Sequence, residues 1–155
     1  MPVFIFLHVL TMFVAVAMAY GPALMMLVAQ NDVRTLRGVM AANASLTRFV
    51  APTFVLGLLF GVAAIFVHNF NPLAGWLVIA YVLFAATALM PIVFTGPWMK
   101  RVTAAAEASA DDAPSAELRE LLTSRRNRLL LTLDALIIVA LIADMVLKPL
   151  PGPIL

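Results

Sequence analysis

The chain has 155 residues, of which 64% are hydrophobic and 12% are charged, and its formal net charge is +2. Soluble domains are nearer half apolar and a quarter charged, so this composition excludes an ordinary water-soluble fold and requires part of the surface to face lipid. The absence of cysteine excludes disulfides, thiol catalysis and cysteine-ligated metal sites. The length allows one domain, and we expect residues 1–155 to form a single membrane domain.

The first predicted element is an apolar run over residues 3–29 that contains His8. Residues 17–19 (Ala-Met-Ala) have the small-x-small form of a leader cleavage site, but no basic residue precedes Arg34 and the apolar run continues beyond them. The run is long enough to cross about 30 Å of hydrocarbon as a helix. We therefore expect a spanning helix rather than a cleaved leader, with a kink at Pro22.

Three more apolar runs follow, at about residues 49–67, 73–94 and 129–147, and each is long enough to be a spanning helix. Before the second run, Val33, Leu36 and Met40 recur at helical spacing, and Asn31 or Asp32 is the expected helix cap.

The connection over about residues 95–128 is predicted to be cytoplasmic. Its first part, from Thr103, is small and polar and is expected to be a flexible linker. Pro114 and Glu117 are helix-start signals, and we expect the helix that begins there to run without a break into the fourth span. The predicted fold class is all-α: a polytopic membrane protein, a four-transmembrane-helix bundle with a cytoplasmic helical extension before the fourth span.

The basic residues indicate the orientation of the spans. Nine of the ten Lys and Arg residues lie in the first and third connections, and only Lys148 follows the fourth span. Positive loops stay in the cytoplasm, so both termini are predicted to lie on the outer side of a bacterial inner membrane. Because these residues stand between apolar runs, they indicate topology, and nucleic acid is not an expected partner.

Polar side chains inside the spans are costly, and each is a candidate for function. His8 shares a helical face with small residues and is expected to point into the bundle. Gly57 and Gly61 form a four-residue glycine repeat, and His68 stands further along the same face, at the outer edge of the second span. Two interpretations stay open: ordinary glycine packing, or space for a flat macrocycle whose iron is bound by His8 and His68, since imidazole is a common axial ligand of haem.

Asp134 and Asp144 stand ten residues apart in the fourth span, so both can face inward. Asp144 is at a depth similar to that of His8, and a His8–Asp144 hydrogen bond is predicted, either to orient a ligating imidazole or as a structural pair. An ion pair with Arg48 is the structural alternative for Asp134. A proton path through Asp134, Tyr20 and Asp144 is a further hypothesis.

The segments "FLHVL" and "RTLRGVM", together with Pro22, Pro52 and the glycines of the second span, resemble a superfamily of small bacterial membrane proteins. It includes uncharacterised integral-membrane families, copper-resistance protein D and HemJ-type protoporphyrinogen oxidase. The resemblance implies that His8 faces a haem. Thr11, Met12 and Phe13 stand where the HemJ-like branch has a tryptophan, and no basic residue lies within residues 73–94, so the uncharacterised branch is the better match.

Two functions are therefore carried forward from the sequence. The first is a small integral membrane protein that binds haem b or takes part in redox chemistry. The second is a non-catalytic accessory or structural subunit of a larger membrane complex, or a homo-oligomer, with the lipid bilayer as the common partner. Metal or proton transfer through His8, Asp134 and Asp144 in an oligomer is a third and weaker hypothesis.

Overall fold

A computed structural model describes residues 2–111, 113–150 and 152. These residues form six α-helices and one π-helical turn, and no β-strand occurs among them. Four helical stretches are long and apolar enough to cross a membrane, and they are Val3–Ala29, Val33–Val67, Gly75–Glu107 and Arg125–Leu147. The predicted all-α class with four spanning helices is thereby confirmed. The last residues predicted for the first, second and fourth spans, Ala29, Val67 and Leu147, are those of the structure, whereas the second and fourth spans start earlier than predicted.

The chain divides into two compact units. One comprises Met1–Phe70 with Ala106–Ser115, and the other comprises Asn71–Ala105 with Ala116–Leu155.

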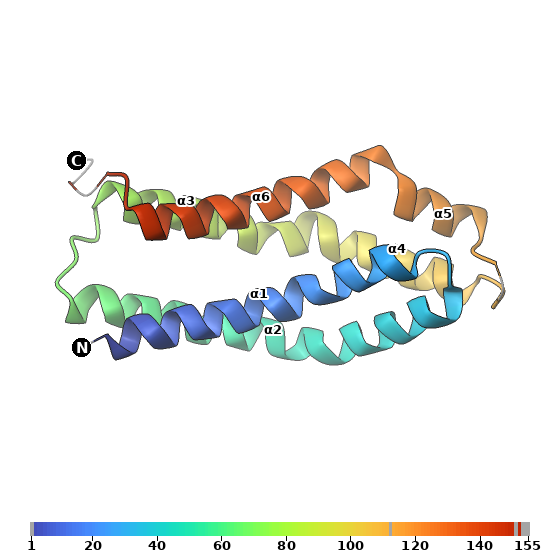
Figure 1. Ribbon diagram of the computed structural model, residues 1–155, viewed down its shortest axis with the longest axis horizontal. Coiled ribbons are helices and arrows are strands. Elements are labelled where there is room, and N and C mark those ends of the chain that lie inside the picture. Colours follow the sequence, from blue (N-terminus) through green and yellow to red (C-terminus); the bar gives the residue numbers. More distant parts are fainter. Residues whose placement is uncertain (1, 112, 151, 153–155) are drawn as a thin grey trace. The chain divides into compact units, whose positions relative to one another are not determined.

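In the first unit, α1 (Val3–Ala29) and α2 (Val33–Val67) form an antiparallel pair and lie side by side in Figure 1. Asp32 caps α2, because its carboxylate accepts hydrogen bonds from the Thr35 backbone N–H at 3.1 Å and from the Thr35 hydroxyl at 2.6 Å. These hydrogen bonds hold the pKa of Asp32 below its usual value. Of the two residues predicted as the cap, Asn31 and Asp32, the structure has Asp32.

The second span is longer than predicted. α2 is a single helix of 35 residues that begins at Val33, so the helical segment expected before the span and the span itself are one element. We expected the span to start near residue 49 because the apolar run begins there. Polar residues do not interrupt a helix, so the helix itself begins earlier, at Val33. Pro52 lies inside α2 without ending it, as membrane helices permit.

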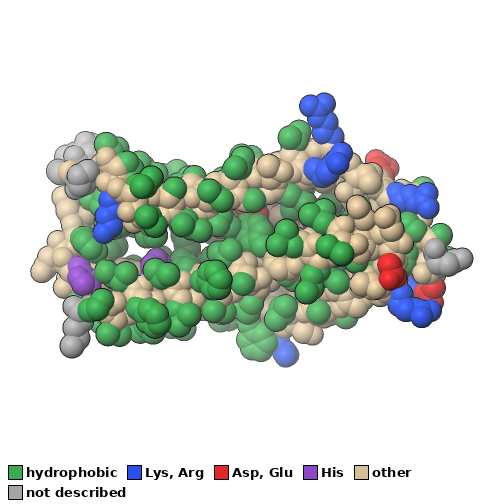
Figure 2. All heavy atoms as spheres, viewed as in Figure 1, with side chains coloured by type: hydrophobic (Ala, Val, Ile, Leu, Met, Phe, Trp, Pro, Cys, Tyr) green, Lys and Arg blue, Asp and Glu red, His purple; other side chains and the backbone are tan. Residues whose placement is uncertain are grey.

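The outer faces of this helix pair are apolar. Large hydrophobic side chains such as Phe13 and Val28 are 72% and 89% exposed. Figure 2 shows hydrophobic side chains over the lengths of the helices. Exposed apolar surface of this extent is stable only in lipid or against another apolar surface, so the helices associate with the bilayer.

In the second unit, α3 (Gly75–Met90) and the π-helical turn η1 (Pro91–Thr95) continue without interruption into α4 (Gly96–Glu107), whose last two residues belong to the first unit. Pro91 has no N–H, and the Gly96 N–H donates to the Pro91 carbonyl across five residues. A Cβ at residue 96 would lie 2.4 Å from that oxygen, so the turn requires glycine. The linker was predicted over residues 103–114, and this is wrong for Thr103 to Glu107, which are helical because this alanine-rich stretch favours helix. The described residues from 108 to 114 are not helical.

The helix before the fourth span is interrupted, so the predicted unbroken helix is also wrong. α5 (Ala116–Thr123) ends before Ser124, whose backbone is extended, and α6 (Arg125–Leu147) begins after it. The Leu121 carbonyl accepts hydrogen bonds from the Trp98 indole at 3.2 Å and from the Asn127 amide at 2.9 Å. These side chains stabilise the end of α5 by occupying one of its last carbonyls.

The start of α3 is capped by the chain segment that follows α6. The Gly75 N–H donates to the Gly152 carbonyl at 2.9 Å and the Trp76 N–H donates to the Leu150 carbonyl at 3.2 Å. A Cβ at residue 75 would lie 2.4 Å from the Leu150 Cβ. The glycine therefore permits the close approach, and α3 and α6 pack as an antiparallel pair.

Candidate functional site

His8 lies in the second turn of α1 and contacts the glycine face of α2. Its Nδ1 lies 2.7 Å from the Gly57 carbonyl oxygen. A carbonyl only accepts, so Nδ1 carries a proton and donates it, and in a neutral imidazole the free lone pair would then be on Nε2. The predicted inward direction of His8 thus has a definite partner, which is a backbone oxygen of α2.

The glycines of α2 accommodate side chains of α1. A Cβ at residue 61 would lie 2.9 Å from His8 Nδ1 and 3.0 Å from its Cε1, and a Cβ at Gly57 would lie 2.9 Å from the Met12 sulfur. The imidazole and the thioether therefore occupy the space that the missing side chains leave. Of the two interpretations of the glycine repeat, packing accounts for the observed contacts.

His68 is the C-cap residue of α2, and its ring stacks on Phe70 with centroids 5.7 Å apart. It lies seven residues beyond Gly61, which corresponds to about 10 Å along the helix axis. Its assignment as a second iron ligand stays a prediction.

The hydrogen-bonded imidazole of His8 fits the role of an iron ligand, but the glycine face beside it does not fit the porphyrin. Ligating imidazoles almost always donate their other ring N–H to a carbonyl or carboxylate, and the His8–Gly57 hydrogen bond supplies this orientation. The glycine face itself does not supply space for a macrocycle, since His8 and Met12 fill it. A bound porphyrin would therefore meet His8 from its Nε2 side.

The two acidic residues of α6 lie in the second unit and are buried. Asp134 is 3% exposed and Asp144 is 7% exposed. Neither carboxylate oxygen of Asp144 has a hydrogen-bond partner among the described residues of the second unit. Tyr20 and His8 belong to the first unit, so the His8–Asp144 hydrogen bond and the path through Tyr20 stay predictions.

Arg48, the predicted structural partner of Asp134, lies in the first unit. Its guanidinium is 4.8 Å from the centroid of the Phe49 ring, in a cation–π contact. An ion pair between Arg48 and Asp134 stays a prediction.

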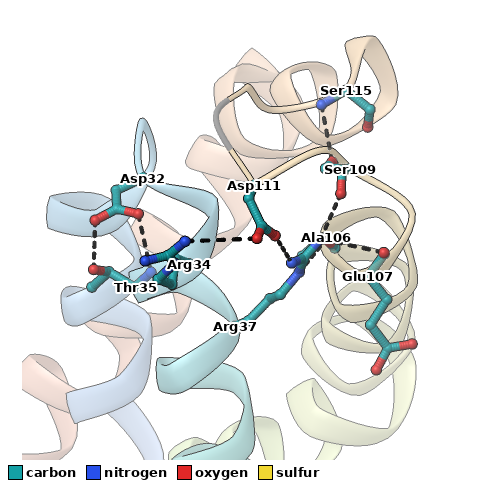
Figure 3. A network of polar contacts seen from close by, with 9 residues as sticks. All are labelled: Asp32, Arg34, Thr35, Arg37, Ala106, Glu107, Ser109, Asp111 and Ser115. Atoms are coloured by element: carbon teal, nitrogen blue, oxygen red, sulfur yellow. Dashed lines mark hydrogen bonds and ion pairs between the residues drawn. The ribbon is translucent and has the colours of Figure 1, made fainter.

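Sequence reasoning missed the role of Arg37. Its guanidinium donates to the Ala106 carbonyl at 2.9 Å, to the Ser109 carbonyl and to the Asp111 carboxylate, as Figure 3 shows. These contacts satisfy carbonyls at the end of α4, where a cation is also favoured by the helix dipole. In the sequence Arg37 is only one of nine basic residues that mark topology, and its partners lie about 70 positions away.

An apolar groove of about 330 Å³ opens between α1 and α2 near Pro22, which lies inside α1. The sequence did not indicate this groove. Its lining is entirely apolar: Phe13, Val14, Ala17, Met18, Gly21, Pro22, Met25, Val39, Ala42 and Leu46. Among the described residues, no group of three or more His, Cys, Asp or Glu side chains is placed to hold a metal ion.

Comparison with known proteins gives one family. The family model described as "Predicted integral membrane protein (DUF2269)" matches residues 2–149, which is nearly the whole chain. No curated protein and no solved structure matches the chain. The chain belongs to this family of predicted integral membrane proteins, DUF2269.

Proposed function

We propose that this integral membrane protein binds haem b through Nε2 of His8 and takes part in redox chemistry in the membrane. A haem iron exchanges one electron at a time, and the protein's part is to hold and orient its ligand. The single observation that supports the proposal is the 2.7 Å hydrogen bond from His8 Nδ1 to the Gly57 carbonyl.

This hydrogen bond matters because it has two consequences for a ligating imidazole. It fixes the tautomer, which leaves the Nε2 lone pair for a metal, and it fixes the ring against α2. The first two spans resemble a superfamily in which one branch, the HemJ-like branch, ties the histidine that matches His8 to haem. His68 is the proposed second ligand.

The visible spectrum of protein purified from haem-replete cells tests the proposal. We expect a Soret band in the wild-type protein that is lost in His8→Ala. His68→Ala is the matched variant, and loss of the band there too would support two histidine ligands. A folded wild-type protein that carries no haem, and takes up none when haem is added, would contradict the proposal.

The same purification in mild detergent addresses the accessory-subunit alternative. The apolar groove between α1 and α2 is the observation that favours it, since its walls suit an apolar helix as well as a lipid chain. A colourless chain that copurifies with a stoichiometric membrane partner would favour this alternative over haem binding.

We also propose that the protein lies in a bacterial inner membrane with both termini on the outer side, as the basic residues favour. The chain has no cysteine, so single cysteines can be introduced directly for labelling from either side. Labelling of residue 119 from outside intact cells would contradict this orientation.

A further inference from the structure

A carboxyl group lies buried near the end of the fourth span, and no described residue of its own unit donates a hydrogen bond to it. The group is that of Asp144, which is 7% exposed, and neither of its carboxylate oxygens has a hydrogen-bond partner among the described residues of the second unit. It lies three residues before Leu147, the last residue of α6, and so about 5 Å along the axis from the helix end. The group is therefore enclosed but close to one aqueous face.

The basic side chain four residues after Asp144 does not bond this carboxyl. Lys148 follows one turn after Asp144, but its ammonium lies 5.0 Å from the centroid of the Trp76 ring. A cation placed over an aromatic face is held there by the ring quadrupole. The four-residue spacing would suggest an ion pair between Lys148 and Asp144, but the Lys148 ammonium lies over the Trp76 ring instead.

Within the second unit, no titratable group on a neighbouring element bonds Asp144. α3 and α5 pack against α6. α3 carries one titratable side chain, Tyr81, which is 45% exposed. On α6 itself, Asp134 lies ten residues earlier, about 15 Å along the axis. α5 adjoins the start of α6, far from Asp144, and carries Glu117, Arg119 and Glu120.

An ionised carboxylate in this position would lose its hydration and gain no hydrogen bond in exchange, whereas the neutral acid loses far less. We propose that Asp144 is a proton-binding site that exchanges its proton with the aqueous phase at the end of the unit where α3 begins and α6 ends. The inference does not depend on haem binding, since it concerns the second unit alone.

A proton is the ligand that this position suits. A hard metal cation such as Ca²⁺ requires six to eight oxygen ligands. Asp144 is not part of any group of three or more acidic, histidine or cysteine side chains among the described residues. A proton needs only the one carboxyl group.

The test uses the full chain in detergent or lipid and dicyclohexylcarbodiimide, an apolar reagent for protonated carboxyls. The carboxyl proton moves to a carbodiimide nitrogen, the carboxyl oxygen bonds to the central carbon, and an acyl shift to nitrogen gives a stable N-acylurea. We expect peptide mass spectrometry to find this adduct on Asp144. Labelling should fall by about tenfold for each pH unit above the midpoint of its titration.

Asp144→Asn should lose the adduct, and Asp134→Asn is the matched control that should keep the adduct on Asp144. If Asp144→Asn does not fold, the position of the adduct in the wild-type chain still decides the outcome. A folded wild-type chain without label on Asp144 at any pH would overturn the proposal. Suppression of labelling by Na⁺ would overturn it in favour of a metal cation, and increased labelling in His8→Ala would do so in favour of the predicted His8–Asp144 pair.

Discussion

Replacing Gly61 by alanine tests the contact between α1 and α2 directly. The added Cβ would lie 2.9 Å from His8 Nδ1 and 3.0 Å from its Cε1, both too close for atoms in contact. The imidazole must therefore move, and its hydrogen bond to the Gly57 carbonyl is lost or lengthened. Overpacking costs about 1–3 kcal/mol, and a lost interhelical hydrogen bond in a membrane costs about 0.6–2 kcal/mol. We expect Gly61→Ala to lower the free energy of unfolding by about 2–4 kcal/mol.

Gly38→Ala is the matched control on the same helix, because a Cβ there has no atom within 4 Å. It should leave stability unchanged or raise it by up to about 1 kcal/mol, since alanine favours helix over glycine. The assay is unfolding in mixed micelles by increasing SDS, followed by circular dichroism.

A double-mutant cycle with His8→Ala completes this test. Without the imidazole, Gly61→Ala should cost little, so nearly its whole cost should appear as a coupling energy of about 2–4 kcal/mol. Equal effects of Gly61→Ala with and without His8, or equal effects of Gly61→Ala and Gly38→Ala, would refute the reasoning.

Three further predictions concern the ends of helices. Gly75→Ala would place a Cβ 2.4 Å from the Leu150 Cβ, so we expect the C-terminal segment to detach from the start of α3 and to be cleaved faster in limited proteolysis. Arg37→Ala removes donors from several carbonyls at once and should cost about 1–3 kcal/mol, with faster amide hydrogen exchange over residues 106–111; unchanged exchange there would contradict the role assigned to it. The Thr35 hydrogen bonds lower the folded-state pKa of Asp32, so its capping contribution is fully present above the usual value of 3.8 and is lost as the pH falls through the lower folded pKa. Exchange of the Thr35 amide should accelerate only in that acidic window, and Asp32→Asn should remove this pH dependence.

The sequence predicted those features that depend on local chemistry. The C-terminal ends of the first, second and fourth spans follow from where the apolar residues stop. The cap at Asp32 follows from the ability of a carboxylate to accept a hydrogen bond from the backbone N–H three residues later. The inward direction of His8 was also predictable, because small residues share its face. The Gly57 carbonyl as its partner was not, since a backbone atom 49 positions away carries no signal in the sequence.

The errors arose where distant contacts decide local structure. The break at Ser124 accompanies the Trp98 indole, which bonds a carbonyl of α5 from 23 residues away. The polar composition after Thr103 predicted a linker, yet alanine-rich sequence continued the helix to Glu107. Arg37 binds carbonyls of residues that were expected to be unstructured, so the sequence offered no partner for it.

The wide turn at η1 affects how the third span is compared with other helices. A π-helical turn holds one residue more than an α-helical turn, so side chains beyond Gly96 are rotated by about 100° from the positions that an uninterrupted repeat would give them. The buried residues include Ala80 and Thr87 before the turn, and Trp98 and Val102 after it. A substitution scan or a spin-label accessibility scan along this span should therefore show one helical repeat before the turn and a second repeat, offset by one residue, after it.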